Sequence, residues 1–262
     1  MKLLLLLLTP LLLFSKVHYA KVEPFETITL KAAVSAQVTA SKMALEGTTV
    51  SATIIELDDK LDKIKLTSSK DSLRLVDSMI ATNQNILGAL KQSLNKQRAY
   101  YKRISNVTSA SKTQKDNAFY AFTSAKTQYF STKEKIDSLK KQKLDLKYEI
   151  ARLQDSISKK SIKVDNKFLY KLLVSAGDYV NMGTPLAQIK DLSSAKLILF
   201  LENKELENIE AKSIYINNKK TDYTVTKIWK VADEKFISSY RTEIIIKNPK
   251  ESFSKLLKVE FK

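Results

Sequence analysis

The chain is poor in the residues that interrupt helices and in those that most often do catalysis. Its 262 residues include no cysteine, one histidine (His18), four glycines and four prolines. The lack of cysteine excludes disulfides and thiolate nucleophiles, and His18 lies in the N-terminal segment that reads as a signal peptide. Its removal with that segment would leave no Cys-His or Ser-His pair and none of the usual transition-metal ligands. Asp58-Asp59 and the trio Glu205, Glu207 and Glu210 have no partner that suggests acid–base chemistry. We therefore expect a non-enzymatic protein without catalytic residues, cofactor or metal.

Glycine and proline are also unevenly distributed. No proline lies between Pro24 and Pro185, and Gly88 is the only glycine between Gly47 and Gly177. Because these two residue types are the usual helix interrupters, the long middle segment reads as helix. We place this insert at residues 60–160.

Heptad repeats within the insert predict a coiled coil. The first a/d series is apolar at eight of ten places, and the second at ten of twelve. The first consists of Leu73, Val76, Ile80, Asn83, Leu87, Leu90, Leu94, Gln97, Tyr101 and Ile104. The second consists of Ala118, Phe122, Ala125, Tyr129, Thr132, Ile136, Leu139, Lys143, Leu146, Ile150, Leu153 and Ile157.

The two series are separated by a small polar segment, residues 105–111, in which Ser111 is a good N-cap for a returning helix. The arms on either side are nearly equal, so we expect a closed antiparallel hairpin about 70 Å long. Such a hairpin brings the segments that flank it in sequence back together.

Those flanking segments, residues 27–59 and 161–192, have the composition of two halves of one small β-domain. Shifted by 130 positions, residues 44–50 fall on residues 174–180, so that Gly47 coincides with Gly177. We expect strands at 33–38 and 168–174, and structural turns at Gly47, Gly177 and Gly183. The hairpin would then be an insertion that splits this β-domain.

Residues 193–262 alternate strand-like runs with short breaks. Runs at 197–201, 213–216, 223–229, 242–246 and 257–261, with a short helix near 203–209, predict a small β-barrel domain. The predicted fold class is therefore α+β: a long coiled-coil hairpin in a split β-domain, followed by a small β-barrel.

The N-terminus has the pattern of an export signal. Lys2 is followed by an apolar run from Leu3 to Phe14, which is short for a transmembrane helix and typical of a signal peptide. Residues 1–20 are read as this signal, with cleavage after Ala20, and an uncleaved N-terminal anchor is the alternative. Export of a chain without cysteine suits a bacterial envelope protein.

The segment from Gly177 to Ile189 carries a family resemblance. It is similar to the G-D-x-V-x-x-G-x-x-L-A-x-I signature of biotinyl/lipoyl-like domains. With the hairpin insertion and the export signal, the chain resembles the periplasmic adaptors, or membrane fusion proteins, of the HlyD type. The resemblance implies a periplasmic, inner-membrane-associated protein that assembles into a homo-hexamer or other ring. It also implies two partners: an inner-membrane transporter of the RND or ABC type and a TolC-type outer-membrane channel.

The resemblance further implies a docking site for the channel at the hairpin tip. Adaptors that dock there often show an Arg-x3-Leu-x6-Ser pattern followed by Lys and Asp. Ile104 and Ser111 occupy the Leu and Ser places, Lys112 and Asp116 continue the match, and Tyr100 stands where Arg is usual. Arg103 is close enough to supply the missing charge. The alternative is that Ile104 only closes the coiled coil and Ser111 only caps a helix.

Net charge is the last feature that bears on function. The chain carries +17, and residues 60–160 hold 22 Lys or Arg against 9 Asp or Glu. Such a charge attracts acidic partners, or it is simply a solvated coiled-coil surface. Nucleic acid is not an expected partner, because an exported chain leaves the compartment in which nucleic acid is found. The sequence thus predicts an adaptor for efflux or secretion across the envelope, and the alternative is an envelope coiled-coil scaffold without a transport role.

Overall fold

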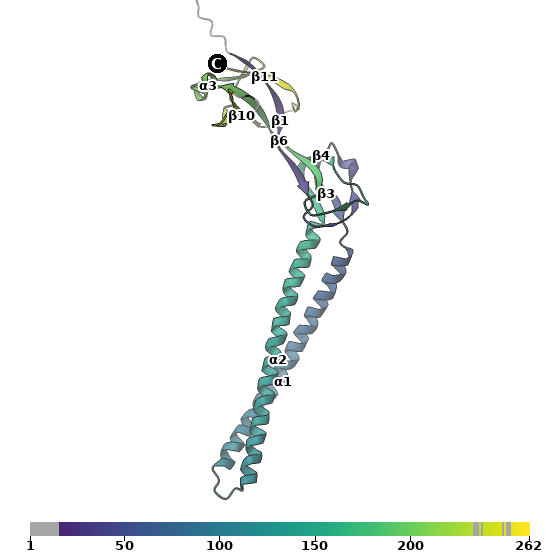
Figure 1. Cartoon of the computed structure of the whole chain (residues 1–262), viewed down its shortest axis with the longest axis vertical. Coiled ribbons are helices and arrows are strands. Elements are labelled where there is room, and N and C mark those ends of the chain that lie inside the picture. The colour runs from purple at the N-terminus through teal and green to yellow at the C-terminus, as the bar shows by residue number, and fades with distance from the viewer. Residues whose placement is uncertain (1–15, 233–235, 237, 248, 250–252) are drawn as a thin grey trace, which may run out of the picture.

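The computed structural model describes residues 16–232, 236, 238–247, 249 and 253–262, and it shows an elongated molecule with three parts in a line (Figure 1). A β-domain with the C-terminus forms one end, a second β-domain follows, and a long helical hairpin forms the other end. In the part of the chain that the structure describes, none of the helices combines the length and the apolar character that crossing a membrane requires.

The middle domain is assembled from segments on both sides of the hairpin. Its strands are β2 (Ala36–Ser41), β3 (Thr49–Leu57), β4 (Ser161–Leu172), β5 (Tyr179–Val180) and parts of β1 (Val17–Lys31) and β6 (Pro185–Glu202), with a short helix η1 (Met43–Leu45). β3 pairs antiparallel with β4 across the insertion, and one buried core includes Ile54 and Ile55 from the first half and Leu169 and Leu186 from the second. The predicted split β-domain is therefore confirmed, although its first predicted strand begins three residues late, at Ala36.

Two turn glycines tie the halves of this domain to each other. Gly47 has a φ of 77° and Gly177 a φ of 100°, in the left-handed region that costs a side-chain-bearing residue about 1–2 kcal/mol. The Gly47 amide donates to the Leu169 carbonyl at 2.8 Å, and the Gly177 amide donates to the Val38 carbonyl, also at 2.8 Å. Each half thus places its turn glycine against a strand of the other half, and Gly183, with a φ of 89°, forms a further turn.

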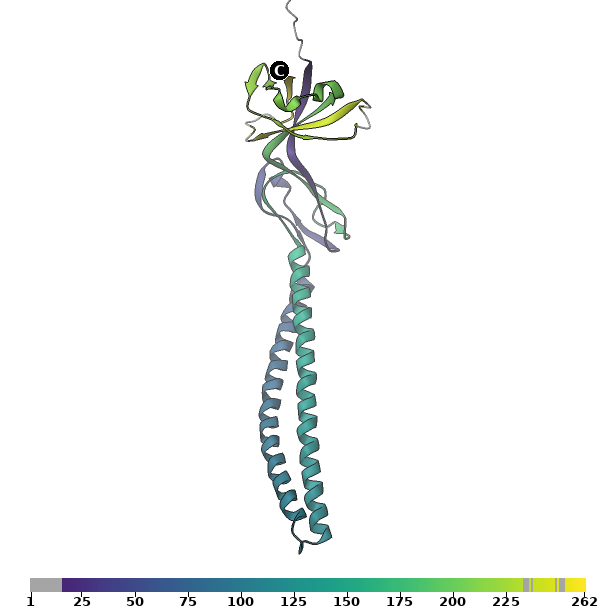
Figure 2. The same cartoon turned by 90° about the vertical axis from the view of Figure 1, so that its left-hand side faces the viewer.

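The hairpin consists of α1 (Lys60–Ser105) and α2 (Lys112–Lys159), which run side by side for their whole length (Figures 1 and 2). All of the predicted a/d side chains are buried or half-buried, including Val76 and Ile80 on α1 and Ile136 and Leu139 on α2. At the base, Asp62 pairs with Lys160 at 2.8 Å and accepts a hydrogen bond from Ser156. The predicted coiled-coil hairpin is confirmed.

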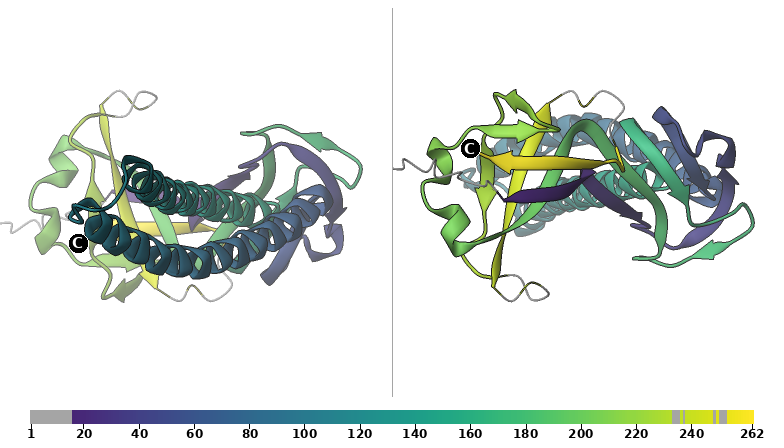
Figure 3. Two further views of the ribbon diagram at one scale, coloured as in Figure 1. Left: turned by 90° about the horizontal axis from the view of Figure 1, so that it is seen from below. Right: turned by 90° about the horizontal axis from the view of Figure 1, so that it is seen from above.

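The terminal β-domain contains the C-terminal strands and, in addition, the first strand of the chain. Its own elements are α3 (Asn203–Leu206), η2 (Ile209–Ala211), β7 (Ile214–Ile216), β8 (Lys219–Thr221), β9 (Val225–Ile228), β10 (Ser239–Lys247) and β11 (Leu256–Phe261). Val17–Lys21 of β1 pairs antiparallel with β11, as the view from above shows (Figure 3). Ala20 and Val22 lie in the core with Leu197 and Ile244, and both are at most 1% exposed.

Two long strands connect the β-domains. β1 and β6 pair from Val22 to Lys31, with a register shift between Pro24 and Glu26 where one domain gives way to the other. At this junction Lys196 lies over the ring of Phe25. A continuous two-stranded ribbon, rather than a flexible linker, therefore sets the hairpin's position relative to the terminal domain.

Candidate functional site at the hairpin tip

The tip is a short loop between two capped helix ends. α1 ends at Ser105, where the Asn106 amide donates to the carbonyls of Arg103 and Ile104, and the Val107 amide donates to the Ile104 carbonyl at 3.2 Å. α2 begins with a capping box in which Ser111 Oγ accepts from the Gln114 amide and Gln114 Oε1 accepts from the Ser111 amide. Reciprocal bonds of this kind satisfy the free amides of a helix start, so the loop has a defined shape.

The predicted docking residues are distributed over both sides of this loop. Ile104 is half-buried at the last seam position of α1, and the hydroxyl of Ser111 caps α2. Lys112 and Asp116 are exposed on the first turns of α2. Ile104 therefore closes the seam and Ser111 caps α2. Both residues help to set the shape of the tip.

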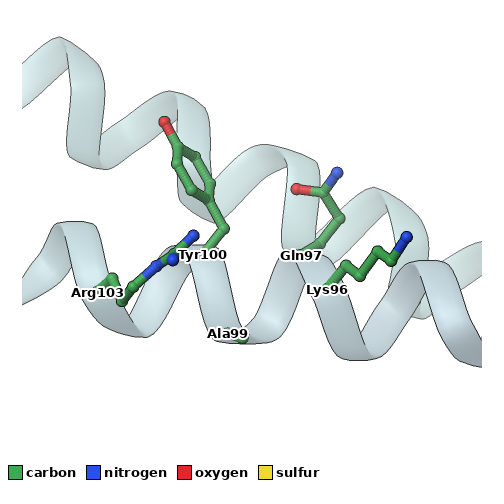
Figure 4. A pocket seen from close by; sticks show the side chains of 5 residues that line it. All are labelled: Lys96, Gln97, Ala99, Tyr100 and Arg103. Carbon is green, nitrogen blue, oxygen red and sulfur yellow. The ribbon is translucent and has the colours of Figure 1, made fainter.

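Tyr100 and Arg103 come together on the outer side of α1. They line an open groove of about 620 Å³ with Lys96, Gln97 and Ala99. Figure 4 shows these side chains projecting from successive turns of the helix. Tyr100 is 42% exposed, so an aromatic side chain and two cationic side chains are available to a partner here. Arg103 is thus beside the position of Tyr100, where the docking pattern has its arginine.

An aromatic layer lies directly below the tip. The ring of Tyr101 stacks on Phe122 with centroids 5.8 Å apart and an interplanar angle of 0°, and it meets Phe119 at 5.6 Å. Phe119 in turn contacts Tyr120, and Tyr129 meets Phe130 edge to face. Aromatic pairs of this geometry add to the stability that burial alone provides. They therefore add to the stability of the distal end of the hairpin.

Several of these aromatic rings face solvent, which the sequence analysis did not recognise. Tyr120 is 68% exposed, and Phe119 and Phe130 are about half exposed. Their signal was present in the sequence, because residues 117–132 contain a single charged residue, Lys126. Exposed aromatic side chains on an otherwise polar surface are typical of protein interfaces.

Charge is unbalanced in the same region. We define the distal half of the hairpin as residues 84–132 and the proximal half as residues 60–83 and 133–160. The distal half has eight Lys or Arg and one acidic residue, Asp116. None of these charged side chains forms an ion pair in the part of the chain that the structure describes. The tip is therefore a cationic surface that can attract an acidic one.

Known structures share this architecture. MacA from Actinobacillus actinomycetemcomitans matches with a TM-score of 0.64 and 17% identity, over 95% of this chain and 78% of that one. A MacA–MexA chimeric protein with the Pseudomonas aeruginosa MexA α-hairpin domain gives a TM-score of 0.57 and 16% identity, over 95% and 78% of the chains. The membrane fusion protein Spr0693 from Streptococcus pneumoniae R6 gives 0.56 and 9% identity, over 95% and 98%.

Sequence comparison alone finds no matching protein-family profile and no matching curated protein. The chain nevertheless shares the fold of these proteins, one of which is a membrane fusion protein, and in this chain that fold consists of a helical hairpin, a split β-domain and a terminal β-domain. The resemblance to HlyD-type periplasmic adaptors predicts this fold, and for the fold that prediction is confirmed.

Proposed function

We propose that the protein is a periplasmic adaptor that links an inner-membrane transporter of the RND or ABC type to a TolC-type outer-membrane channel. The observation that carries the proposal is the hairpin itself, which extends from a compact β-base and ends in a capped, cationic and aromatic tip. A rigid extension of this kind bridges a distance, and the chain's scarcity of histidine and cysteine suits a mechanical rather than a catalytic role.

In this proposal the hairpin tip and the β-domains contact different partners. The tip, with Tyr100, Arg103, Ile104, Ser111, Lys112 and Asp116, docks to the end of the channel. The two β-domains contact the transporter and neighbouring copies, and six or a similar number of copies close into a ring that seals the conduit. Ring formation multiplies weak contacts, so no single interface needs high affinity.

The structure also supports a specific attachment to the inner membrane. Cleavage after Ala20 would divide β1 and remove Val17–Ala20 from its pairing with β11. It would also remove His18, whose Nε2 lies 2.7 Å from Oε1 of Glu205, and Ala20 from the barrel core. We therefore propose that the chain is not cut at Ala20 and that the apolar run before residue 16 remains attached as a membrane anchor.

A crosslinking experiment tests the channel partner. A photoreactive residue replaces Ser109, which is exposed in the tip loop, and the captured protein is identified by mass spectrometry in cells of the source organism. Capture of an outer-membrane channel is the expected result. Capture of only peptidoglycan-associated or soluble proteins would favour the alternative of an envelope scaffold without a transport role.

A substitution tests the tip contact. We expect Ile104→Asp to abolish channel capture while helicity measured by circular dichroism is retained, because the charge falls at the last seam position and the rest of the seam is intact. Thr67→Asp places the same charge on the exposed face near the hairpin base and serves as the control. Normal capture by folded Ile104→Asp would contradict the docking assignment.

The anchor is tested on the protein itself. Intact mass and N-terminal sequencing of chain purified from membranes should show that residues 1–20 are present, and the protein should resist extraction by high salt. A folded, salt-extractable protein that begins at Lys21 would contradict this assignment without affecting the adaptor proposal.

A further inference from the structure

A pocket lies at the junction of the two β-domains, where β1 and β6 pass from one domain to the other (Figure 1). Its volume is about 560 Å³, and its lining comes from β1, β4, β6 and the segment before β11. It is far from the hairpin tip along the molecule. Pockets of this size at domain boundaries are common binding places for small molecules.

One wall of the pocket is a row of side chains across three paired strands. Lys190 of β6 is opposite Thr27 of β1 on one side and opposite Phe168 of β4 on the other. Directly opposed residues on neighbouring strands project from the same face of a sheet. Tyr170, two residues beyond Phe168, also lines the pocket. This wall therefore carries two aromatic rings and one ammonium group.

The ammonium group of Lys190 is held over the ring of Tyr170, with Nζ 3.7 Å from the ring centroid. The negative face of an aromatic ring attracts a cation, and it does so more strongly where water is partly excluded. Lys190 is half-buried and has no ion pair among the described residues. By contrast, its neighbour Asp191 pairs with Lys167. The charge of Lys190 is thus positioned without being neutralised.

The second wall belongs to the terminal β-domain. The Val22 amide donates to the Lys255 carbonyl at 3.0 Å, and the Ser254 amide donates to the Val22 carbonyl at 2.9 Å. These two bonds hold the segment before β11 against β1. Phe253, in that segment, is half-buried against the core of the terminal domain and also lines the pocket. An aromatic side chain of one domain is therefore fixed beside the aromatic wall of the other.

The charged side chains of the pocket have a positive sum. Lys21 and Lys190 supply two cations, and Glu23 supplies one carboxylate. In the described ranges of the chain, none of these three side chains forms an ion pair or a hydrogen bond. Unpaired charges in a concave and partly apolar site attract a ligand of opposite sign. The lining therefore favours an anion.

The rest of the lining indicates what the anion is attached to. Phe168, Tyr170 and Phe253 bring three aromatic side chains to one pocket. Aromatic side chains pack on a flat ring by offset stacking or edge to face. A pocket of about 560 Å³ has room for a drug-sized molecule. The chemistry described by the lining is that of a small aromatic ring with a sulfonate or carboxylate group.

We infer that this pocket binds a small aromatic anion, whose acidic group is held by the two lysines and whose ring is held by the three aromatic side chains. Such a ligand contacts both β-domains at once. Because the ribbon of β1 and β6 connects these domains, a bound ligand favours one angle between them and so one direction of the hairpin. Binding needs neither the channel nor the transporter.

Calorimetric titration tests the site, with naphthalene sulfonate as the probe. The full-length protein is held in lipid nanodiscs, and empty nanodiscs are the blank. Naphthalene sulfonamide is the matched control ligand, because it has the same ring without the charge. We expect saturable binding of one sulfonate per chain and at least a tenfold lower affinity for the sulfonamide. No saturable binding, equal affinities, or a preference for naphthylmethylammonium would overturn the inference.

Substitutions in the lining test the two signs of charge. Lys190→Met keeps the aliphatic bulk and should weaken sulfonate binding at least tenfold, because the ammonium group beside Tyr170 is lost. Lys171→Met is the matched control, since Lys171 is exposed next to Tyr170 outside the pocket lining, and it should change the affinity by less than twofold.

Glu23→Gln should have the opposite effect and tighten sulfonate binding at least twofold, because it removes a like charge from the pocket. Circular dichroism checks that each variant is folded. Equal losses in the two lysine variants, or weaker binding by folded Glu23→Gln, would show that the sulfonate lies elsewhere and would overturn the inference.

Hydrogen exchange tests whether the ligand contacts both domains. Saturating sulfonate should slow exchange in peptides around residues 20–25 of the terminal domain and 167–171 of the middle domain, whereas peptides around 104–112 at the tip should not change. Protection of one domain only, or equal protection of the tip, would overturn the inference. Channel capture from residue 109 is a separate measurement, so the pocket and the adaptor function can each fail without the other.

Discussion

The proximal and distal halves of the hairpin use the same seam but treat their charges differently. In the proximal half, cations of one helix meet carboxylates of the other: Lys65 with Glu149 at 3.0 Å, Lys143 with Asp77 at 2.5 Å, and Lys160 with Asp62 at 2.8 Å. The distal half has eight cations, one carboxylate and a group of exposed aromatic rings. The proximal half pairs several of its charges across the two helices, whereas the charged side chains of the distal half form no ion pair among the described residues and stay open to solvent.

The largest effect is expected in the aromatic layer of the distal half. Tyr101→Ala removes a ring that contacts both Phe119 and Phe122, and it should lower the local free energy of unfolding by about 2 kcal/mol. Hydrogen exchange of distal peptides measures this change. Tyr100→Ala, at the exposed neighbouring position, should change the same exchange by less than about 0.5 kcal/mol. Equal effects of the two variants would mean that the layer does not hold the tip.

The next effect is expected at the base of the proximal half. Asp62→Asn breaks the pair with Lys160, whose side chain is only 12% exposed, and should cost between about 1 and 2 kcal/mol. Asp71→Asn breaks the exposed pair with Arg74 and should cost at most about 0.5 kcal/mol. Hydrogen exchange of peptides around residues 60–66 compares the two variants. If Asp71→Asn is the more damaging, the proximal half does not depend on its cross-helix pair.

The tip caps should contribute less to the free energy of unfolding. Ser111→Ala removes the hydroxyl that accepts from the Gln114 amide, and it should destabilise the start of α2 by about 1 kcal/mol. Ser111→Asp keeps an acceptor at the N-cap and should retain most of the stability. Amide exchange of residues 112–118 reports the change. An unchanged rate in Ser111→Ala would show that the cap is not needed to hold the loop.

The smallest effect is expected from the ion pairs of Glu149 in the proximal half, and it depends on pH. Hydrogen bonds from Arg152 and Lys65 lower the pKa of the Glu149 carboxyl from 4.5 to about 2. A lowered folded-state pKa stabilises the folded form above the ordinary value, and this contribution is lost as pH falls through the folded value. Glu149→Gln should therefore melt at a lower temperature than the natural chain at pH 6, and the difference should shrink between about pH 4.5 and 2. A difference that persists at pH 2 would contradict the ion-pair origin.

The seam and the strands were predictable because they depend on local periodicity. Val76, Ile80, Ile136 and Leu139 recur at heptad spacing, and burying them requires only that the two helices meet. The capping role of Ser111 was likewise visible, because an N-cap acts on amides within three residues. The candidate docking residues remain a prediction. That Tyr100 and Arg103 are neighbours follows from their spacing of three residues on a helix, and the structure adds the groove that they line.

The strand Val17–Lys21 was not predicted, for a physical reason. Its partner β11 begins at Leu256, at the other end of the chain, and the pairing leaves no short-range pattern. The segment also follows an apolar run that is typical of export, so its residues were read as part of the signal. Only the packing of Ala20 and Val22 against Leu197 and Ile244 shows that they belong to the terminal β-domain.

The sequence by itself determined the order of parts: a long hairpin, its turn, two half-domains with glycine turns and a strand-rich end. Each of these follows from residue spacing over a few turns or strands. Only the tertiary structure decided which distant segments pair, at which residue β1 passes from the terminal to the middle β-domain, and which hairpin side chains remain exposed. The reason is that burial and long-range pairing depend on the whole chain. The surfaces available to partners consist of the side chains that are neither buried nor paired within it.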